Sequence, residues 1–266
     1  MVMQGKRAVI LMMVGAGMMW TGSVSAETPE EKGHAVFVEA EKRDAGFKDT
    51  SAEIKMVLIN KQNSASERSM SIHVLEGPED ADKSLIVFQS PKDQKGTALL
   101  THQQLDRDDD QWLYLPALKR VKKISSSKKS GPFVGSEFSF EDVGGQLVED
   151  YTYKLLREEP CEGQRCFVVE SYPKDKHSGY TRIVNWIDTA HYRTLKADFY
   201  DRKNSHLKTL EAKGFKQYKD KFWRPDELHM ENHQTGRKTI LRQESIQFDS
   251  GLQEADFNKN SLKRAR

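Results

Sequence analysis

A series of short apolar runs separated by polar turns constrains the fold of this chain more than any other feature. In the run 69–75, Met70, Ile72 and Val74 alternate with polar residues, and similar runs recur up to 238–248. Alternation with a period of two is typical of strands that bury one face. The separating turns are too short for the crossovers that parallel strands need, so we predict a mainly β fold with about eleven antiparallel strands.

A sheet of about eleven strands must curl, split or close, which predicts strong curvature and a concave face that apolar groups fill. Thr28 and Pro29 predict the start of a helix that extends to about Arg43, with Gly46 after it. This N-terminal helix and the loop around residues 131–145 are the segments available to cover the concave face. Residues 252–258 indicate a short closing helix.

Residues 1–26 have the pattern of a cleaved signal peptide. Lys6 and Arg7 precede an apolar run at 8–20, and a small-residue segment ends at Ala26. A retained N-terminal anchor is the alternative, although the run is short for a membrane span. We therefore expect a secreted protein, in a bacterial periplasm, whose residues 27–266 form a single domain.

The charge and the cysteines restrict the possible functions further. Loss of Lys6 and Arg7 with the signal peptide leaves 40 basic and 40 acidic residues, so the charge does not indicate nucleic-acid binding. Cys161 and Cys166 lie between two strand-like runs and predict a disulfide that closes a hairpin. A redox or metal pair is the alternative, but the CxxC spacing and a neighbouring histidine are missing.

Residues 110–145 combine apolar bulk, positive charge and flexible backbone. Phenylalanines among glycines suit a lid over an apolar cavity, although they are also ordinary core residues. The cations suit a surface for an acidic partner or an anionic headgroup, or else the solvated edge of a sheet. The apolar candidates are Trp112, Tyr114, Leu115, Phe133, Phe138 and Phe140; the basic candidates are Lys119, Arg120, Lys122, Lys123, Lys128 and Lys129.

Motifs for catalysis or metal binding are weak. The segment 125–129 contains S-x-x-K twice, but the partner motifs S-D-N and K-T-G are absent. His229 and His233 lie on a strand-like segment, where the spacing of four residues separates their side chains. The acidic turn 106–110 lacks the glycine and the final glutamate of a calcium loop. We expect a protein that is not an enzyme and that uses no cofactor or metal.

The segment WLYLPALKRVKKISSSKKSGPFVGSEFSFEDV resembles a signature of periplasmic outer-membrane lipoprotein-sorting proteins, relatives of the LolA carrier. The resemblance extends over residues 27–266, and it implies an unclosed barrel whose mouth is covered by helices. It also implies a cavity that receives acyl chains and carries them across the periplasm. The chain is longer than the housekeeping carrier is expected to be, and its signature is similar to that of a divergent branch with partners among RND-type exporters.

Two functions follow from this resemblance. The first is a carrier, expected to be a monomer, that binds lipid or lipoprotein acyl chains and passes them from an inner-membrane exporter to an outer-membrane acceptor. The second is an accessory module that docks on an RND-type exporter through its basic residues without carrying cargo. The cargo itself does not follow from the sequence.

Overall fold

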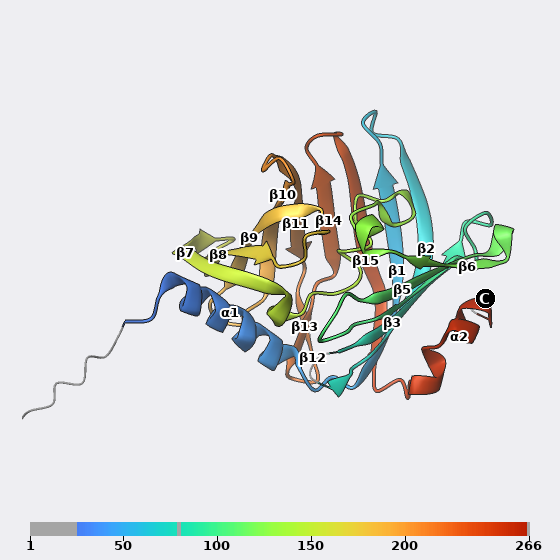
Figure 1. Ribbon diagram of the computed structural model, residues 1–266, viewed down its shortest axis with the longest axis horizontal. Coiled ribbons are helices and arrows are strands. Elements are labelled where there is room, and N and C mark those ends of the chain that lie inside the picture. The colour runs from blue at the N-terminus through green and yellow to red at the C-terminus, as the bar shows by residue number, and fades with distance from the viewer. Residues whose placement is uncertain (1–25, 79–80, 265–266) are drawn as a thin grey trace, which may run out of the picture.

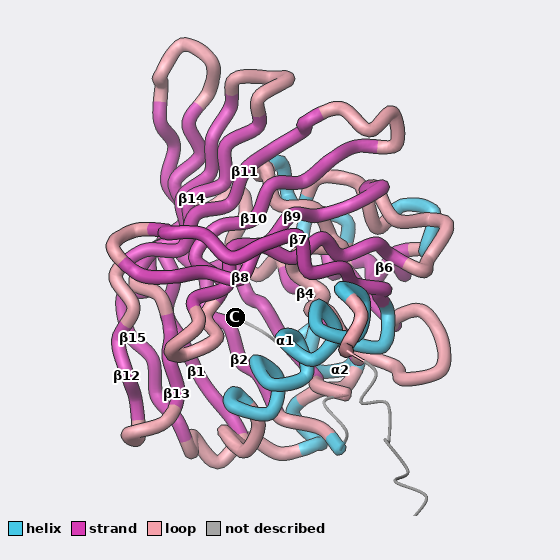
Figure 2. The backbone as a smooth tube through the Cα atoms, turned by 90° about the vertical axis from the view of Figure 1, so that its left-hand side faces the viewer, coloured by secondary structure: helices cyan, strands magenta, loops and turns pink. Residues whose placement is uncertain are grey.

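A computed structural model describes residues 26–78 and 81–264 and shows a mainly β protein (Figure 1). One antiparallel sheet of 13 strands has the order β6-β5-β4-β3-β2-β1-β15-β14-β11-β10-β9-β8-β7. The end strands β6 and β7 do not pair with each other, so the sheet is curved but not closed, as Figure 2 shows from the side. This architecture confirms the predicted fold class.

The strands follow one another along the chain, and most neighbours in sequence are neighbours in the sheet. Their bounds are β1 (Asp49–Ile59), β2 (Ala65–Leu75), β3 (Lys83–Ser90), β4 (Ala98–His102), β5 (Asp110–Leu115), β6 (Arg120–Ile124), β7 (Tyr151–Cys161), β8 (Gln164–Pro173), β9 (Tyr180–Asp188), β10 (Thr194–Asp201), β11 (His206–Lys213), β12 (Lys216–Tyr218), β13 (Phe222–Arg224), β14 (Glu227–Asn232) and β15 (Arg237–Phe248). The helices are α1 (Pro29–Asp44) and α2 (Lys259–Arg264), with short 3-10 turns η2 (Pro116–Leu118), η3 (Ser126–Lys128), η4 (Phe133–Gly135), η5 (Val148–Asp150) and η6 (Glu254–Asp256).

Helix α1 forms where the sequence predicts it. The Thr28 hydroxyl accepts a hydrogen bond from the Glu31 amide, and the Glu31 carboxylate accepts one from the Thr28 amide, which completes a capping box. The helix packs against β7. Gly33 permits this approach, because a Cβ at this position would lie 2.7 Å from the Leu155 backbone nitrogen.

The sheet buries apolar side chains on both faces. On β3, Ile86 and Phe88 pack with Phe133 from the long segment between β6 and β7. The alternate residues Leu85 and Val87 pack with a different cluster, which includes Leu262 of α2. We call the face covered by residues 129–148 the inner face, and the face covered by α2 the outer face. Residues 129–148 are called the inner loop.

The sheet has more strands than the sequence indicates. The strand-like runs at 206–218 and 222–232 each divide into two strands. Pro225, between β13 and β14, has no amide hydrogen with which to continue a ladder, and Gly214, between β11 and β12, adopts a φ of +67°. The two parts next to the connecting turn, β12 and β13, form a separate two-stranded ribbon. The basic run contributes the additional edge strand β6, whose exposed cations hide the usual apolar alternation.

Neither α1 nor α2, in the part of the chain that the structure describes, is long and apolar enough to cross a membrane. The predicted signal peptide lies almost entirely outside the described residues. It therefore stays a prediction.

Candidate functional site: an apolar cavity under the inner loop

An apolar cavity of about 280 Å³ lies between the inner face of the sheet and the inner loop. Its sheet wall comes from five neighbouring strands, β3, β2, β1, β15 and β14. Phe133, Phe138 and Val143 of the inner loop cover it. The sheet residues that line it are Met56, Met70, Ile72, Val74, Ser84, Ile86, Leu228 and Leu241.

The inner loop is a compact structure with its own hydrogen bonds. The Phe133 amide donates to the Phe138 carbonyl at 2.7 Å, and the Phe140 amide donates to the Gly131 carbonyl at 3.1 Å. Val134 adopts a φ of 47°, which is a strained conformation for a β-branched side chain. Such strain persists only where surrounding contacts hold the backbone, and it is common in segments that move during function.

A buried ion pair holds the inner loop to the sheet. The Lys208 ammonium on β11 lies 2.5 Å from the Asp142 carboxylate, and both side chains are about 95% buried. Lys208 also donates to the Glu137 carbonyl, while Asp142 accepts hydrogen bonds from the Tyr180 hydroxyl and the Ser139 amide. The charges are therefore well compensated, which is the condition for burying them.

Two further carboxylates, Glu137 and Glu141, hold the middle of the loop to the sheet and its turns. Glu137 accepts a hydrogen bond from Asn232 and pairs with Arg237 at 3.0 Å, at the turn between β14 and β15. Glu141 accepts hydrogen bonds from the Ser178 hydroxyl and the Gly179 amide. Burial raises the pKa of Glu141 despite these bonds.

The sequence-predicted apolar residues divide between the two faces of the sheet. Phe133 and Phe138 line the cavity, and Phe140 packs edge-on against Phe133 with ring centroids 5.8 Å apart. Trp112 and Tyr114 instead belong to the outer cluster, beside α2 and remote from the cavity lining. Side chains alternate along β5, so Leu113 packs in the inner cluster with Phe133. Leu115, the last residue of β5, is half-buried and does not line the cavity.

The six predicted basic residues do not form one uniform surface. Lys119, Arg120, Lys122 and Lys128 are exposed. Leu118 precedes the first of them, and its exposed fraction of 67% is unusual for leucine. Lys123 is exposed but pairs with Asp110 at 2.5 Å. Lys129 is half-buried and pairs with Asp175. Lys119, Arg120 and Lys122 therefore remain on the exposed hairpin of β5 and β6, whereas Lys128 lies beyond it in η3.

Cys161 and Cys166 form the predicted disulfide at the end of the β7–β8 hairpin. His229 lies on β14 and contacts Glu227, a residue of its own strand, rather than His233. His233 packs against the ring of His206. The two histidines that the sequence singles out as a weak metal motif are thus engaged separately.

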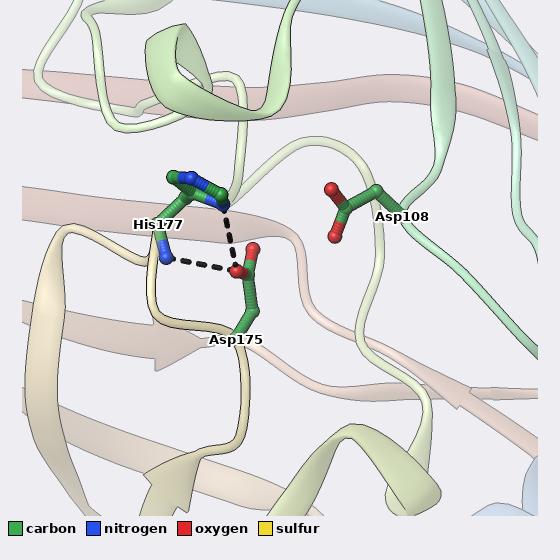
Figure 3. Close-up of side chains that lie close together, drawn as sticks. All are labelled: Asp108, Asp175 and His177. Carbon is green, nitrogen blue, oxygen red and sulfur yellow. Dashed lines mark hydrogen bonds and ion pairs between the residues drawn. The ribbon is translucent and has the colours of Figure 1, made fainter.

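Asp108, Asp175 and His177 bring three potential ligand atoms within 4.8 Å of one another (Figure 3). The His177 amide and ring both contact the Asp175 carboxylate, and Lys129 supplies a positive charge to the same carboxylate. Asp110, which the calcium-loop pattern groups with Asp108, pairs with Arg107 and Lys123 instead. The cluster is an ion-paired polar network at the surface.

The strand residues of the cavity were not predicted as a site from the sequence. The signal was the alternation that placed Met70, Ile72 and Val74 on one face of β2. That pattern identifies a buried face, but it does not distinguish a packed core from a cavity wall. Lys208 and Asp142 gave no sequence signal, because charged residues are common and their meeting depends on tertiary structure.

The comparisons with known proteins agree with one another on the family. A family model described as "uncharacterized protein" matches residues 80–264. An outer membrane lipoprotein-sorting protein domain, so described, from Vibrio parahaemolyticus is 51% identical over 88% of this chain and all of its own, with a TM-score of 0.87. A DUF1329 family protein from Desulfovibrio piger is 30% identical over 89% of this chain and all of its own, with a TM-score of 0.84.

A LolA superfamily protein from Nitrosomonas europaea shares the fold at 19% identity, with a TM-score of 0.70 over 86% of this chain and 98% of its own. The comparison with curated proteins found no match.

Proposed function

Because this chain belongs to the LolA-like family of outer-membrane lipoprotein-sorting proteins, we propose that it is a periplasmic carrier that binds the acyl chains of lipids or lipoproteins and transfers them towards the outer membrane. The observation that carries the proposal is the apolar cavity of about 280 Å³ under the inner loop. The predicted signal peptide at 1–26 and the Cys161–Cys166 disulfide support a periplasmic location.

The free energy that an apolar cavity provides to an acyl chain is large. Each methylene group that leaves water gains about 0.8 kcal/mol, so a long acyl chain gains on the order of 10 kcal/mol from an apolar site. Shielding alone provides this free energy, and no covalent step is required. The sheet wall of Met56, Met70, Ile72 and Leu241 offers the flexible and branched aliphatic side chains that fit an acyl chain.

The cavity is small for this cargo, so binding requires movement of the inner loop. Ligand pockets measure about 300–1,000 Å³, and this cavity is near the lower limit. Phe138 lines the cavity on one side and a second groove of about 620 Å³ on the other. Displacement of Phe138 would join the two spaces, and the strained backbone at Val134 favours such a rearrangement.

The direct test is to purify the protein from periplasm and to identify bound lipid by native mass spectrometry followed by extraction. A bound population with the mass of lipid or acylated protein is expected. The delipidated protein should also bind a neutral apolar fluorophore such as N-phenyl-1-naphthylamine. Absence of both bound lipid and fluorophore binding would reject the carrier.

A pair of variants on β2 locates the binding site. Ile72→Trp places a bulky ring in the cavity and should abolish fluorophore binding, because Ile72 is part of the lining. Ser66→Trp adds the same ring at an exposed position of the same strand and should leave binding unchanged. Equal binding by the two variants would place the apolar site elsewhere.

The exposed β5–β6 hairpin favours a second role beside cargo binding. Leu118 is exposed on it, and the exposed Lys119 and Lys122 that follow make no ion pair among the described residues. We propose that it docks on an inner-membrane exporter. A photo-crosslinker at position 122 should capture that exporter in cells, whereas the same group at position 66 should not.

A further inference from the structure

A second opening borders the apolar cavity at the end of the sheet where α1 leads into β1. This groove of about 430 Å³ is bounded by the last turn of α1, residues 145–148, the turn before β10 and the ribbon of β12 and β13. Figure 1 shows α1 and this ribbon next to each other below the sheet. The groove and the cavity share three lining residues, Asp82, Gln103 and Gly145.

Among the three shared residues, Gln103 has the longest and most flexible side chain. Gln103 donates its amide hydrogen to the Asp82 carbonyl, and its side-chain oxygen accepts a hydrogen bond of 3.0 Å from the Asp82 amide. Gly145 has a φ of +92°, and a Cβ at this position would lie 2.4 Å from the Gln103 side-chain nitrogen. Rotation of the Gln103 side chain therefore breaks only one hydrogen bond at the boundary between the groove and the cavity.

The groove differs from the cavity in its chemistry, because cations lie over aromatic rings. The Arg43 guanidinium lies 4.2 Å from the Tyr192 ring centroid, and that of Arg193 lies 4.6 Å from the Trp223 ring centroid. These arginines are balanced by carboxylates, Arg43 by Glu39 and Arg193 by Asp188.

Lys221 is different from these arginines. Its side chain lines the groove and donates a hydrogen bond to the Ala45 carbonyl, at the C-terminal end of α1. Within residues 26–78 and 81–264, it makes no ion pair. An ammonium group has three donors, so two remain for an anion that enters the groove.

We propose that this groove binds the anionic headgroup of an amphiphile whose acyl chain occupies the apolar cavity, with Lys221 as the counter-ion and Gln103 as the partition. The inference rests on the proposed carrier function and adds the class of ligand and the position of its head. A carboxylate and a phosphate share the chemistry that Lys221 recognises. This placement differs from the basic hairpin, which lies on the edge strand β6.

The test uses the mature chain, freed of lipid and loaded with N-phenyl-1-naphthylamine, which has no charge. Hexadecanoate, palmitoyl lysophosphatidylglycerol and the neutral 1-palmitoylglycerol compete for it with the same acyl chain. At least one anionic competitor should bind about tenfold more tightly than the neutral one, the ratio that one charge-assisted hydrogen bond provides. The preferred anion distinguishes a carboxylate from a phosphate.

Lys221→Gln should remove this preference and leave the affinity for 1-palmitoylglycerol unchanged, while Lys221→Arg should retain it. Lys122→Gln is the matched control, because it removes one exposed cation from the basic hairpin. Gln103→Ala should accelerate association of the anionic ligand.

Equal affinities for anionic and neutral competitors, or loss of the preference in Lys122→Gln but not in Lys221→Gln, would overturn the inference while the carrier function stands. Failure of the fluorophore and all three competitors to bind would reject the carrier function and this inference with it.

Discussion

Lys208→Met is expected to destabilise the protein strongly and to loosen the inner loop. The substitution keeps the length and the apolar part of the side chain but removes the ammonium group. Asp142 then remains buried with hydrogen bonds from Tyr180 and Ser139 but without a counter-ion. Among the described residues, no cation other than Lys208 pairs with this carboxylate, so its neighbours cannot replace the lost charge.

The expected loss in the free energy of unfolding follows from the geometry of the ion pair. At 2.5 Å, two unit charges attract by about 7 kcal/mol when the effective dielectric constant is about 20. Desolvation of the two charges offsets much of this attraction in the intact pair. Removal of Lys208 leaves the desolvation penalty of the Asp142 carboxylate in place. Breaking a buried pair in this way costs about 3–5 kcal/mol. That is a large part of the free energy of unfolding of a domain, about 5–15 kcal/mol.

Urea unfolding followed by tryptophan fluorescence measures the effect. Asp142→Asn should also destabilise, and the double variant should lose about 0.5–3 kcal/mol less than the sum of the single variants. Lys213→Met is the control, because its pair with Glu211 lies on the same strand but is 47% and 42% exposed. It should change the free energy of unfolding by less than about 1 kcal/mol.

Lys208→Met also tests whether the Lys208–Asp142 ion pair keeps the inner loop in place. If Lys208 and Asp142 hold the loop over the cavity, Lys208→Met should increase the rate at which N-phenyl-1-naphthylamine associates. A loss of stability below about 1 kcal/mol, or strict additivity in the double variant, would refute the reasoning about the buried pair.

Three other changes test separate parts of the structure. Gly33→Ala should destabilise by about 1–3 kcal/mol, since its Cβ would lie 2.7 Å from the β7 backbone; a stabilised helix, measured by thermal unfolding, would contradict this. Burial raises the pKa of Asp109 from 3.8 to about 7, so the folded protein holds a proton that the unfolded chain has lost. The free energy of unfolding should therefore fall as the pH rises from 4 to 7, by at most about 1.4 kcal/mol per pH unit. Asp109→Asn should flatten that part of the pH profile of stability, and an unchanged profile would contradict the assignment. Replacing Cys161 and Cys166 by alanine should cost about 2 kcal/mol in urea unfolding without changing fluorophore affinity, because the disulfide is outside the cavity lining.

Prediction from sequence was reliable where local patterns decide the structure. The alternation at 69–75 became β2, and the Thr28–Glu31 pattern became the capping box of α1. It was less reliable where both faces of a strand are apolar. In β5, Trp112 is as apolar as Leu113, and only the positions of α2 and the inner loop determine which of them faces the cavity.

Local sequence patterns were enough to predict an antiparallel sheet, a capped N-terminal helix and a disulfide-closed hairpin. These features depend on residues that are close in the chain, and their signals are periodicity, capping chemistry and cysteine spacing. Only the tertiary contacts bring the inner loop over the sheet, Asp142 to Lys208 from 66 residues away, and Gln103 into the lining of both the cavity and the groove. The reason is that curvature of an open sheet brings distant segments together, and the resulting contacts have no counterpart in local sequence patterns.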